Sequence, residues 1–209
     1  MEGANELIEL GRELARLGFT WASSGNLSMR TGEGFTMTAS GSRLPRLGEN
    51  DLVTVDANGE PIAGAADARP SKEAGMHLAV YRRVAEANCV IHLSPPFTTF
   101  LACSQLALPA HAFPEGMMHL RDAVRVPYRH AGSDELAQEV GQHCTGSQVL
   151  ILENHGALVW AATSEEALLK LEVLEFGARL AVLGSATGSG LKLLGNEVVD
   201  EFVSSGYRR

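Results

Sequence analysis

Three polar residues that are far apart in the sequence could form an open site for a divalent metal ion. His92 ends an apolar run that begins at Cys89, and His155 follows a second apolar run just before Gly156. Glu73 is expected in the first turn of a helix. Two imidazoles and one carboxylate are a ligand set that leaves a coordination position for substrate. Each residue alone also has a structural explanation, since a carboxylate at a helix start favours the helix dipole and histidines at strand ends usually have structural partners.

Glu73 and His77 are spaced i,i+4 and would share one face of the expected helix. This spacing suits a metal site or a local ion pair. On local grounds alone the structural explanation is the stronger one, so His77 is not counted among the candidate ligands.

Small polar clusters could bind an anion. Hydroxyl, amide and glycine residues gather at 23–26 and at 38–42, and Pro70-Ser71 opens the helix that would carry Glu73. Glycine lets backbone N–H groups approach an anion, and a helix start offers free N–H groups. Each cluster alone is typical of a turn. Together they indicate a phosphate pocket, provided that the fold brings them together.

The elements that must position these residues follow from hydrophobic spacing and from turn residues. Antiparallel strands are expected early, and helices between strands later, which predicts one α+β or layered α/β/α domain over residues 1–209. Ser71, Ser133 and Ser164 are expected to cap helices. We expect helices over 4–18, 71–87, 97–105, 134–144 and 165–183, and strands over 26–30, 34–38, 52–56, 60–62, 89–92, 124–127, 149–152 and 157–160.

The composition excludes several classes of protein. The 209 residues carry 17 Lys and Arg against 25 Asp and Glu, for a net charge of −8, and 45% are hydrophobic. This balance argues against disorder, against nonspecific nucleic-acid binding and against docking on an acidic membrane. No stretch reaches the roughly 18 apolar residues of a membrane helix, and the first residues do not read as a secretory signal. Three scattered cysteines form no disulfide framework, so we expect a cytoplasmic protein.

Taken together, these segments resemble the class II aldolase/adducin-type superfamily, and in particular its fuculose-1-phosphate aldolase-like members. The resemblance implies a three-layer α/β/α fold with a largely antiparallel central sheet. It also implies a homotetramer with active sites between neighbouring subunits. The matching segments are Ser24-Gly25-Asn26-Leu27-Ser28, Thr38-Ala39-Ser40-Gly41, Pro70-Ser71-Lys72-Glu73 with His77, Val90-Ile91-His92, and Leu152-Glu153-Asn154-His155-Gly156-Ala157.

The resemblance also implies a role for each matching residue. His92 and His155 would bind a divalent metal, most readily Zn²⁺, with Mn²⁺, Co²⁺ or Fe²⁺ as alternatives. Glu73 would contact that metal in the free enzyme and shuttle a proton in catalysis. Tyr207 is a candidate for the catalytic tyrosine near the C-terminus. The residues that would hold the substrate phosphate are Gly25, Asn26, Ser40, Gly41 and Ser71.

Two positions depart from the family pattern. Ser94 stands where the family usually has a further metal-binding histidine, and a neutral hydroxyl is a poor zinc ligand. His111 or His119 could replace that ligand. Lys72 stands where a small residue is common, and its amine would either join the anion site or point to solvent.

The function implied by the resemblance is that of a metal-dependent aldolase. Such an enzyme cleaves a small phosphorylated ketose to dihydroxyacetone phosphate and an aldehyde, with the metal acting as Lewis acid. Glu73 favours this reaction, because the epimerase branch usually has Asp at that position. Two alternatives stay open. One is another metal-enolate reaction on the same scaffold, by a dehydratase, epimerase or decarboxylase. The other is a noncatalytic adducin-like binding module, which the serine at position 94 favours.

Overall fold

An eight-stranded sheet forms the centre of the protein. The computed structural model describes residues 2–32 and 34–205. The strand order is β4-β3-β2-β1-β5-β8-β7-β6, and neighbouring strands are antiparallel except for the parallel pair of β6 and β7. The strands are β1 (Asn26–Thr31), β2 (Gly34–Thr38), β3 (Leu52–Val55), β4 (Pro61–Gly64), β5 (Cys89–Leu93), β6 (Val124–Val126), β7 (Val149–Leu152) and β8 (Gly156–Ala161).

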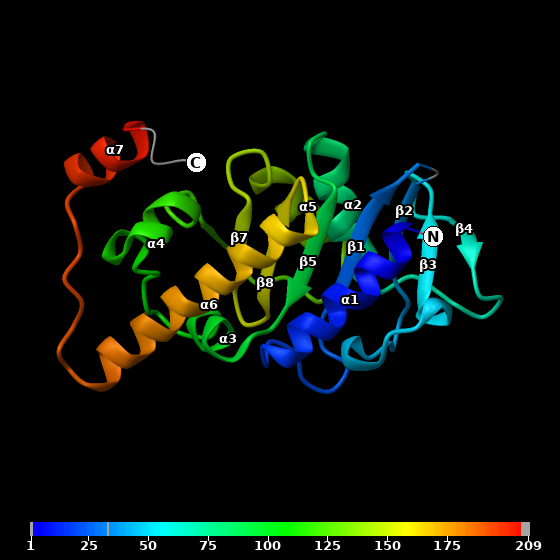
Figure 1. Cartoon of the computed structure of the whole chain (residues 1–209), viewed down its shortest axis with the longest axis horizontal. Coiled ribbons are helices and arrows are strands. Elements are labelled where there is room, and N and C mark those ends of the chain that lie inside the picture. The colour runs from blue at the N-terminus through cyan, green and yellow to red at the C-terminus, as the bar shows by residue number, and fades with distance from the viewer. Residues whose placement is uncertain (1, 33, 206–209) are drawn as a thin grey trace.

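Helices cover both faces of the sheet (Figure 1). The helices α1, α3 and α6 pack on one face, and α2 and α5 pack on the other. Among the described residues, no helix combines the length and the apolar character needed to cross a membrane. The helices are α1 (Glu2–Arg16), α2 (Ala74–Arg83), α3 (Pro96–Ala102), α4 (Pro114–His119), α5 (Asp134–His143), α6 (Ser164–Ala186) and α7 (Asn196–Ser204).

The central strand β5 shows why this arrangement is stable. Neighbouring residues of a strand point to opposite faces of a sheet. Ile91 therefore packs into the core beneath α1 and α6, while Val90 packs into the core beneath α2 and α5. Every residue of β5 is buried. The predicted three-layer α/β/α fold with a largely antiparallel sheet is confirmed.

Two predicted helix caps are wrong. Ser71 does not cap α2, because residues 71–73 form a turn in which the Ser71 Oγ accepts a hydrogen bond from the Glu73 N–H, and the helix begins only at Ala74. The helix α6 is capped by Thr163 rather than by Ser164. The Ser164 hydroxyl instead donates a hydrogen bond to Glu6 in α1. The predicted helix over 71–87 is therefore shorter at both ends, with α2 ending at Arg83.

A buried carboxylate fixes the segment that follows β5. Glu175 of α6 is 6% exposed and accepts hydrogen bonds from the N–H groups of Phe97 and Thr98 and from the Thr98 hydroxyl. These donors lie in the first turn of α3, where backbone N–H groups have no partner within the helix. Glu175 thus caps α3 from a distance and fixes the chain just after β5.

We expect Glu175→Ala to lower the free energy of unfolding by about 3 kcal/mol, because the buried donors at the start of α3 lose a charged acceptor. Urea unfolding measures this difference. The matched control is Glu172→Ala, since Glu172 is exposed on the same helix. Equal destabilisation by the two substitutions would contradict the capping role.

Candidate metal and substrate site

A cleft of about 430 Å³ opens at the ends of the central strands, where β5 ends and β7 turns into β8. It gathers the start of β1, the turn after β2 and the segment that leads into α2. An isolated bridge between Ala39 and Pro70 joins the last two, and the Ser40 N–H donates to the Arg69 carbonyl at 2.8 Å beside it. Three stretches of the sequence that are widely separated therefore line one cleft.

Glu73, His92 and His155, called the triad below, meet in this cleft. Their potential ligand atoms all lie within 4.8 Å of one another. The Nε2 of His92 is 3.3 Å from Oε2 of Glu73, and the Nε2 of His155 is 3.1 Å from Oε1 of Glu73. The two imidazoles meet edge to face, with ring centroids 4.7 Å apart. Among the described residues this is the one group of this kind that could hold a metal ion.

The local backbone explains how each member of the triad is placed. Glu73 is the last residue before α2 begins, and His92 lies one residue before the end of β5. His155 lies in the tight turn between β7 and β8, where Asn154 has a positive φ of 54°. The residue after His155 must be glycine, because a Cβ at Gly156 would lie 2.4 Å from the carbonyl oxygen of Leu93.

The donor atoms of the triad fit a cation. The Nδ1 of His92 lies 2.9 Å from the carbonyl oxygen of Ala157, which can only accept, so Nδ1 carries the proton and donates it. In neutral His92 the lone pair of Nε2 then faces the Glu73 carboxylate. Buried Oε1 of Glu73 receives no hydrogen bond among the described residues, although His155 Nε2 is close. A divalent cation between these atoms would satisfy all three, and nitrogen with carboxylate oxygen suits zinc and its neighbours.

The electrostatics keep Glu73 ionised. Burial by itself raises the pKa of Glu73, but the adjacent His155 and His92 outweigh burial and hold this pKa well below its ordinary value. The carboxylate is therefore available as a ligand. An ionised carboxylate beside two imidazoles is the state that metal binding requires.

His77 takes neither role that its spacing suggested. Because Glu73 precedes α2 instead of lying in its first turn, the two residues do not form a helical i,i+4 pair. The His77 ring is 2% exposed and contacts Asn26 and Ser28 of β1. His77 is thus neither a member of the triad nor the partner of an ion pair with Glu73.

The five residues expected to hold a phosphate line the same cleft beside the triad, and we call these five residues the polar pocket. Lys72 also lines the cleft but is not counted among them. Gly25 and Gly41 have positive φ angles of 86° and 83°. At Gly25 a Cβ would lie 2.8 Å from the His92 carbonyl oxygen, so only glycine lets β1 approach β5 here. The five are Gly25, Asn26, Ser40, Gly41 and Ser71.

Ser94 lines the cleft and supports the triad through a hydrogen bond to the backbone rather than as a metal ligand. It is 8% exposed, and its hydroxyl donates to the His155 carbonyl oxygen at 3.1 Å. The hydroxyl thus holds the backbone of the turn that carries His155. The ligand set of the triad is therefore two imidazoles and one carboxylate, and Ser94 adds no ligand to it.

Substitution of Ser94 by histidine is expected to raise zinc affinity by about tenfold or more, because an additional imidazole adjoins the triad. Isothermal titration of zinc into metal-free protein measures the change. Ser94→Ala is the matched control, since it removes the hydroxyl without adding a ligand. A Ser94→His protein that binds zinc no more tightly than Ser94→Ala would refute the expectation.

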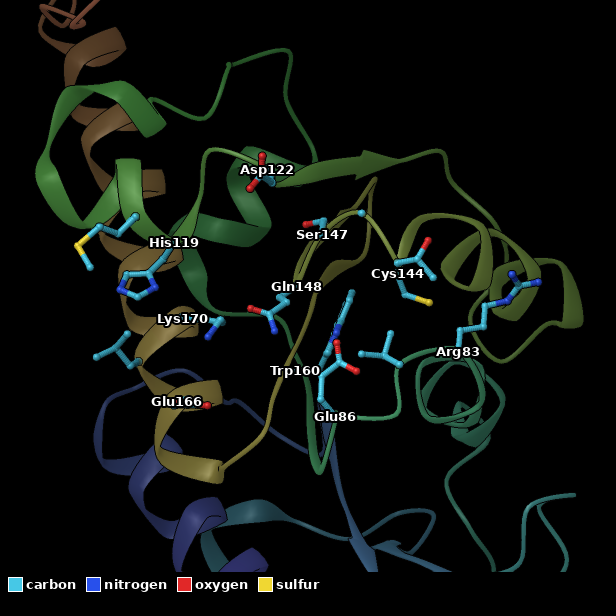
Figure 2. A pocket seen from close by; sticks show the side chains of 15 residues that line it. Arg83, Glu86, His119, Asp122, Cys144, Ser147, Gln148, Trp160, Glu166 and Lys170 are labelled. Atoms are coloured by element: carbon cyan, nitrogen blue, oxygen red, sulfur yellow. The ribbon is translucent and has the colours of Figure 1, made fainter. Parts of the chain in front are cut away.

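His111 and His119 lie away from the triad. His119 lines a larger hollow of about 770 Å³ with Trp160, toward the end of β8 that is remote from the cleft (Figure 2). His111 lies beside Asn196 of α7. Neither histidine belongs to the triad's group of ligand atoms. The expectation that one of them replaces the missing ligand within the described chain is therefore wrong.

Other residues were missed or cannot be placed. Trp21 and Asn154 line the cleft, and Trp21 is 63% exposed there. An asparagine before His-Gly is typical of a turn with positive φ, so the sequence could have predicted that Asn154 lies in the turn beside the triad. Nothing in the spacing pointed to Trp21. Tyr207, the candidate catalytic tyrosine, lies outside the described residues.

Residues 5–182 match the family described as the Class II Aldolase and Adducin N-terminal domain. An L-fuculose phosphate aldolase from Methanocaldococcus jannaschii is 33% identical over 178 residues, which cover 85% of this chain and 94% of that protein. A 3-oxo-tetronate 4-phosphate decarboxylase from Haemophilus influenzae is 31% identical over 179 residues, which cover 83% of this chain and 84% of that protein.

Solved structures share the fold over nearly the whole chain. An L-fuculose 1-phosphate aldolase superposes with a TM-score of 0.89 at 28% identity and covers 98% of this chain and 95% of its own. YgbL from Klebsiella pneumoniae, whose assignment is given only as aldolase/epimerase/decarboxylase, superposes with a TM-score of 0.88 at 29% identity. That match covers 96% of this chain and 97% of YgbL.

Proposed function

Because this chain belongs to the class II aldolase and adducin family and is an aldolase-type enzyme, we propose that it is a metal-dependent sugar-phosphate aldolase. Its substrate would be a phosphorylated ketose, and its products dihydroxyacetone phosphate and an aldehyde. The relatives named as L-fuculose phosphate aldolases support this assignment.

The observation that carries the proposal is the shared cleft. The triad and the polar pocket line one cleft of about 430 Å³. A ketose phosphate needs both parts, one for its ketone and hydroxyl oxygens and the other for its phosphate. Binding the phosphate away from the reacting bond provides orientation and binding energy for the chemical step.

In this proposal the triad would hold a divalent metal, most readily zinc, which would serve as a Lewis acid for the substrate oxygens. The polar pocket would orient the substrate through its phosphate. The bond between the third and fourth carbons breaks, and the hydroxyl of the aldehyde half gives up its proton, for which Tyr207 is the proposed partner. Glu73 delivers a proton to the third carbon, so that dihydroxyacetone phosphate forms.

The proposal also includes a homotetramer in the cytoplasm, with each cleft completed by a neighbouring subunit. Trp21 is a large apolar side chain that is 63% exposed at the rim of the cleft. Exposed aromatic side chains are common where a second protein packs. Light scattering coupled to gel filtration would test this part and should give four times the mass of one chain.

A second candidate is decarboxylation of a phosphorylated 3-oxo acid. The 3-oxo-tetronate 4-phosphate decarboxylase from Haemophilus influenzae favours it. So does Lys72, whose exposed side chain stands beside Ser71 at the cleft. A cationic amine suits a substrate that carries a carboxylate as well as a phosphate. Both reactions would use the triad in the same way, since each needs stabilisation of an enolate.

The deciding experiment incubates zinc-loaded protein with a panel of phosphorylated ketoses and phosphorylated 3-oxo acids and identifies products by mass spectrometry. Dihydroxyacetone phosphate with an aldehyde supports the aldolase. Loss of carbon dioxide supports the decarboxylase instead. Failure to convert any member of the panel with zinc, manganese or cobalt would count against both.

A further inference from the structure

A chain of buried hydrogen bonds runs from the Glu73 carboxylate into the core. The Asn26 Nδ2 donates to Oε2 of Glu73 at 2.9 Å, and the Asn26 Oδ1 lies 2.6 Å from Nε2 of His77. The Nδ1 of His77 lies 2.7 Å from the Ser28 hydroxyl, which lies 2.8 Å from the Tyr81 hydroxyl. We call Asn26, His77, Ser28 and Tyr81 the support chain.

The charge on Glu73 determines the direction of every hydrogen bond in the support chain. An ionised carboxylate only accepts, so the Asn26 amide must turn its NH₂ toward Glu73 and its oxygen toward His77. That oxygen also only accepts, so the His77 Nε2 carries a proton. In neutral His77 the Nδ1 is then bare and accepts from Ser28, whose oxygen in turn accepts from Tyr81.

The surroundings keep this arrangement in one state. Asn26, Ser28, His77 and Tyr81 are 6%, 0%, 2% and 4% exposed. Burial and the nearby His92 lower the pKa of His77 to about 3 despite the opposing carboxylate of Glu73, so His77 is neutral in neutral solution. A buried polar network in which each member is satisfied specifies a single geometry.

We propose that His77, Ser28 and Tyr81 are positioning residues that fix the Asn26 amide, and thereby hold the Glu73 carboxylate for metal binding and proton transfer. The inference rests on the proposed function, because it assigns these residues to the same site. None of the three lines the cleft, so they would act only through Asn26 and Glu73.

Losing the support chain would cost hydrogen-bond energy at Asn26, because the two ends of its amide have similar shapes but opposite hydrogen-bonding roles. Without a donor at His77, the Asn26 oxygen is a buried acceptor with no partner. Turning the amide over would place that oxygen against the Glu73 carboxylate, where two acceptors repel. Either outcome releases Glu73 from its present orientation relative to His92 and His155.

The first test determines the tautomer of His77 in the full-length protein by ¹⁵N NMR on histidine-labelled material at neutral pH. The proposal requires a proton on Nε2 and none on Nδ1. A proton on Nδ1 instead would overturn it, because the Asn26 amide would then be reversed.

The second test compares His77→Leu with His77→Gln. Loss of a residue that orients a ligand typically costs about 10- to 100-fold in metal affinity, so zinc titration should show a loss of that size in His77→Leu. The amide of Gln can donate to Asn26 and accept from Ser28, so His77→Gln should recover most of the affinity. In the loaded enzyme we expect a larger fall in kcat than rise in KM, since the change reaches Glu73 through Asn26 while the other four residues of the polar pocket are unchanged.

Tyr81→Phe and Thr36→Val extend the comparison. Tyr81→Phe removes only the last hydroxyl and should give a smaller loss of zinc affinity in a protein that folds. Thr36→Val is the matched control, because it removes another hydroxyl hydrogen bond of the same sheet, to Thr54, remote from Glu73. A folded His77→Leu protein with wild-type zinc affinity, or an equal loss in Thr36→Val, would overturn the proposal.

Failure of the proposed function would be recognised separately. If wild-type protein converts no phosphorylated sugar or 3-oxo acid, that function falls, while the His77 tautomer and the zinc titration still decide the role of the support chain. If the wild-type protein binds no divalent metal, the proposed function and the metal-positioning role proposed here fall together, and the His77 tautomer then decides only whether the Asn26 amide is oriented as described.

Discussion

His155→Ala is expected to lower zinc affinity more than about 100-fold, because substitutions that merely disturb the orientation of a ligand already cost about 10- to 100-fold. The expected loss exceeds that range because the site has few ligands to spare. With Ser94 in place of a further histidine, removal of His155 leaves only Glu73 and His92 within 3.3 Å of each other. Isothermal titration into metal-free protein, with elemental analysis of the purified protein, measures the change.

The loss of activity in His155→Ala should follow the loss of metal. Excess zinc should therefore restore part of the rate if the alanine only weakens binding. His143→Ala is the matched control, since it removes a histidine of α5 that lies outside the triad. A His155→Ala protein that is purified with as much metal as wild type would show that the triad does not hold the ion.

The strands of the fold could be predicted from the sequence, but their order could not. Alternating and continuous apolar runs predicted β1, β2, β5, β7 and β8 closely, because strand periodicity is local. The placement of β5 between β1 and β8 depends on pairings such as Asn26 with His92 and His92 with Leu158. Those pairings join residues that no local pattern relates. The resemblance to a known family implied the convergence of the triad, and spacing alone did not.

The misplaced start of α2 shows a limit of local rules at the site itself. A serine followed by a glutamate suits a capped helix that begins at Ser71, and it also suits a turn that delays the helix to Ala74. The structure has the turn. This shift of a few residues moves Glu73 from the helix to its end and separates it from the face that carries His77. The ion pair with Glu73 that the i,i+4 spacing suggested for His77 is therefore absent.

The support chain also could not be predicted from local patterns. His77 and Tyr81 are spaced i,i+4 on α2 and look like an ordinary buried helix face. Their partner is Ser28 of β1, on the other side of the α2–sheet interface. Only the packing of α2 on β1 places these polar groups together.

Glu73→Gln is expected to lower kcat by about 10²- to 10⁴-fold, which is the usual contribution of a positioned proton donor or acceptor. The Gln amide has nearly the shape of the carboxylate, and its oxygen can still accept from Asn26 Nδ2, which lies 2.9 Å from Oε2 of Glu73. It cannot exchange a proton with carbon. Steady-state kinetics on the substrate identified by the panel, at saturating zinc, measures the effect.

Deuterium exchange separates the proton step from the role of Glu73 as a ligand. Dihydroxyacetone phosphate incubated with zinc-loaded enzyme in D₂O should exchange one carbon-bound hydrogen in the wild type and lose that exchange in Glu73→Gln. Zinc titration of the same variant shows how much metal it retains. If Glu73→Gln binds zinc poorly but exchanges hydrogen normally once loaded, Glu73 serves only as a ligand. Exchange that disappears while zinc remains bound would assign the proton transfer to Glu73, because the other residues of the triad and the polar pocket are unchanged.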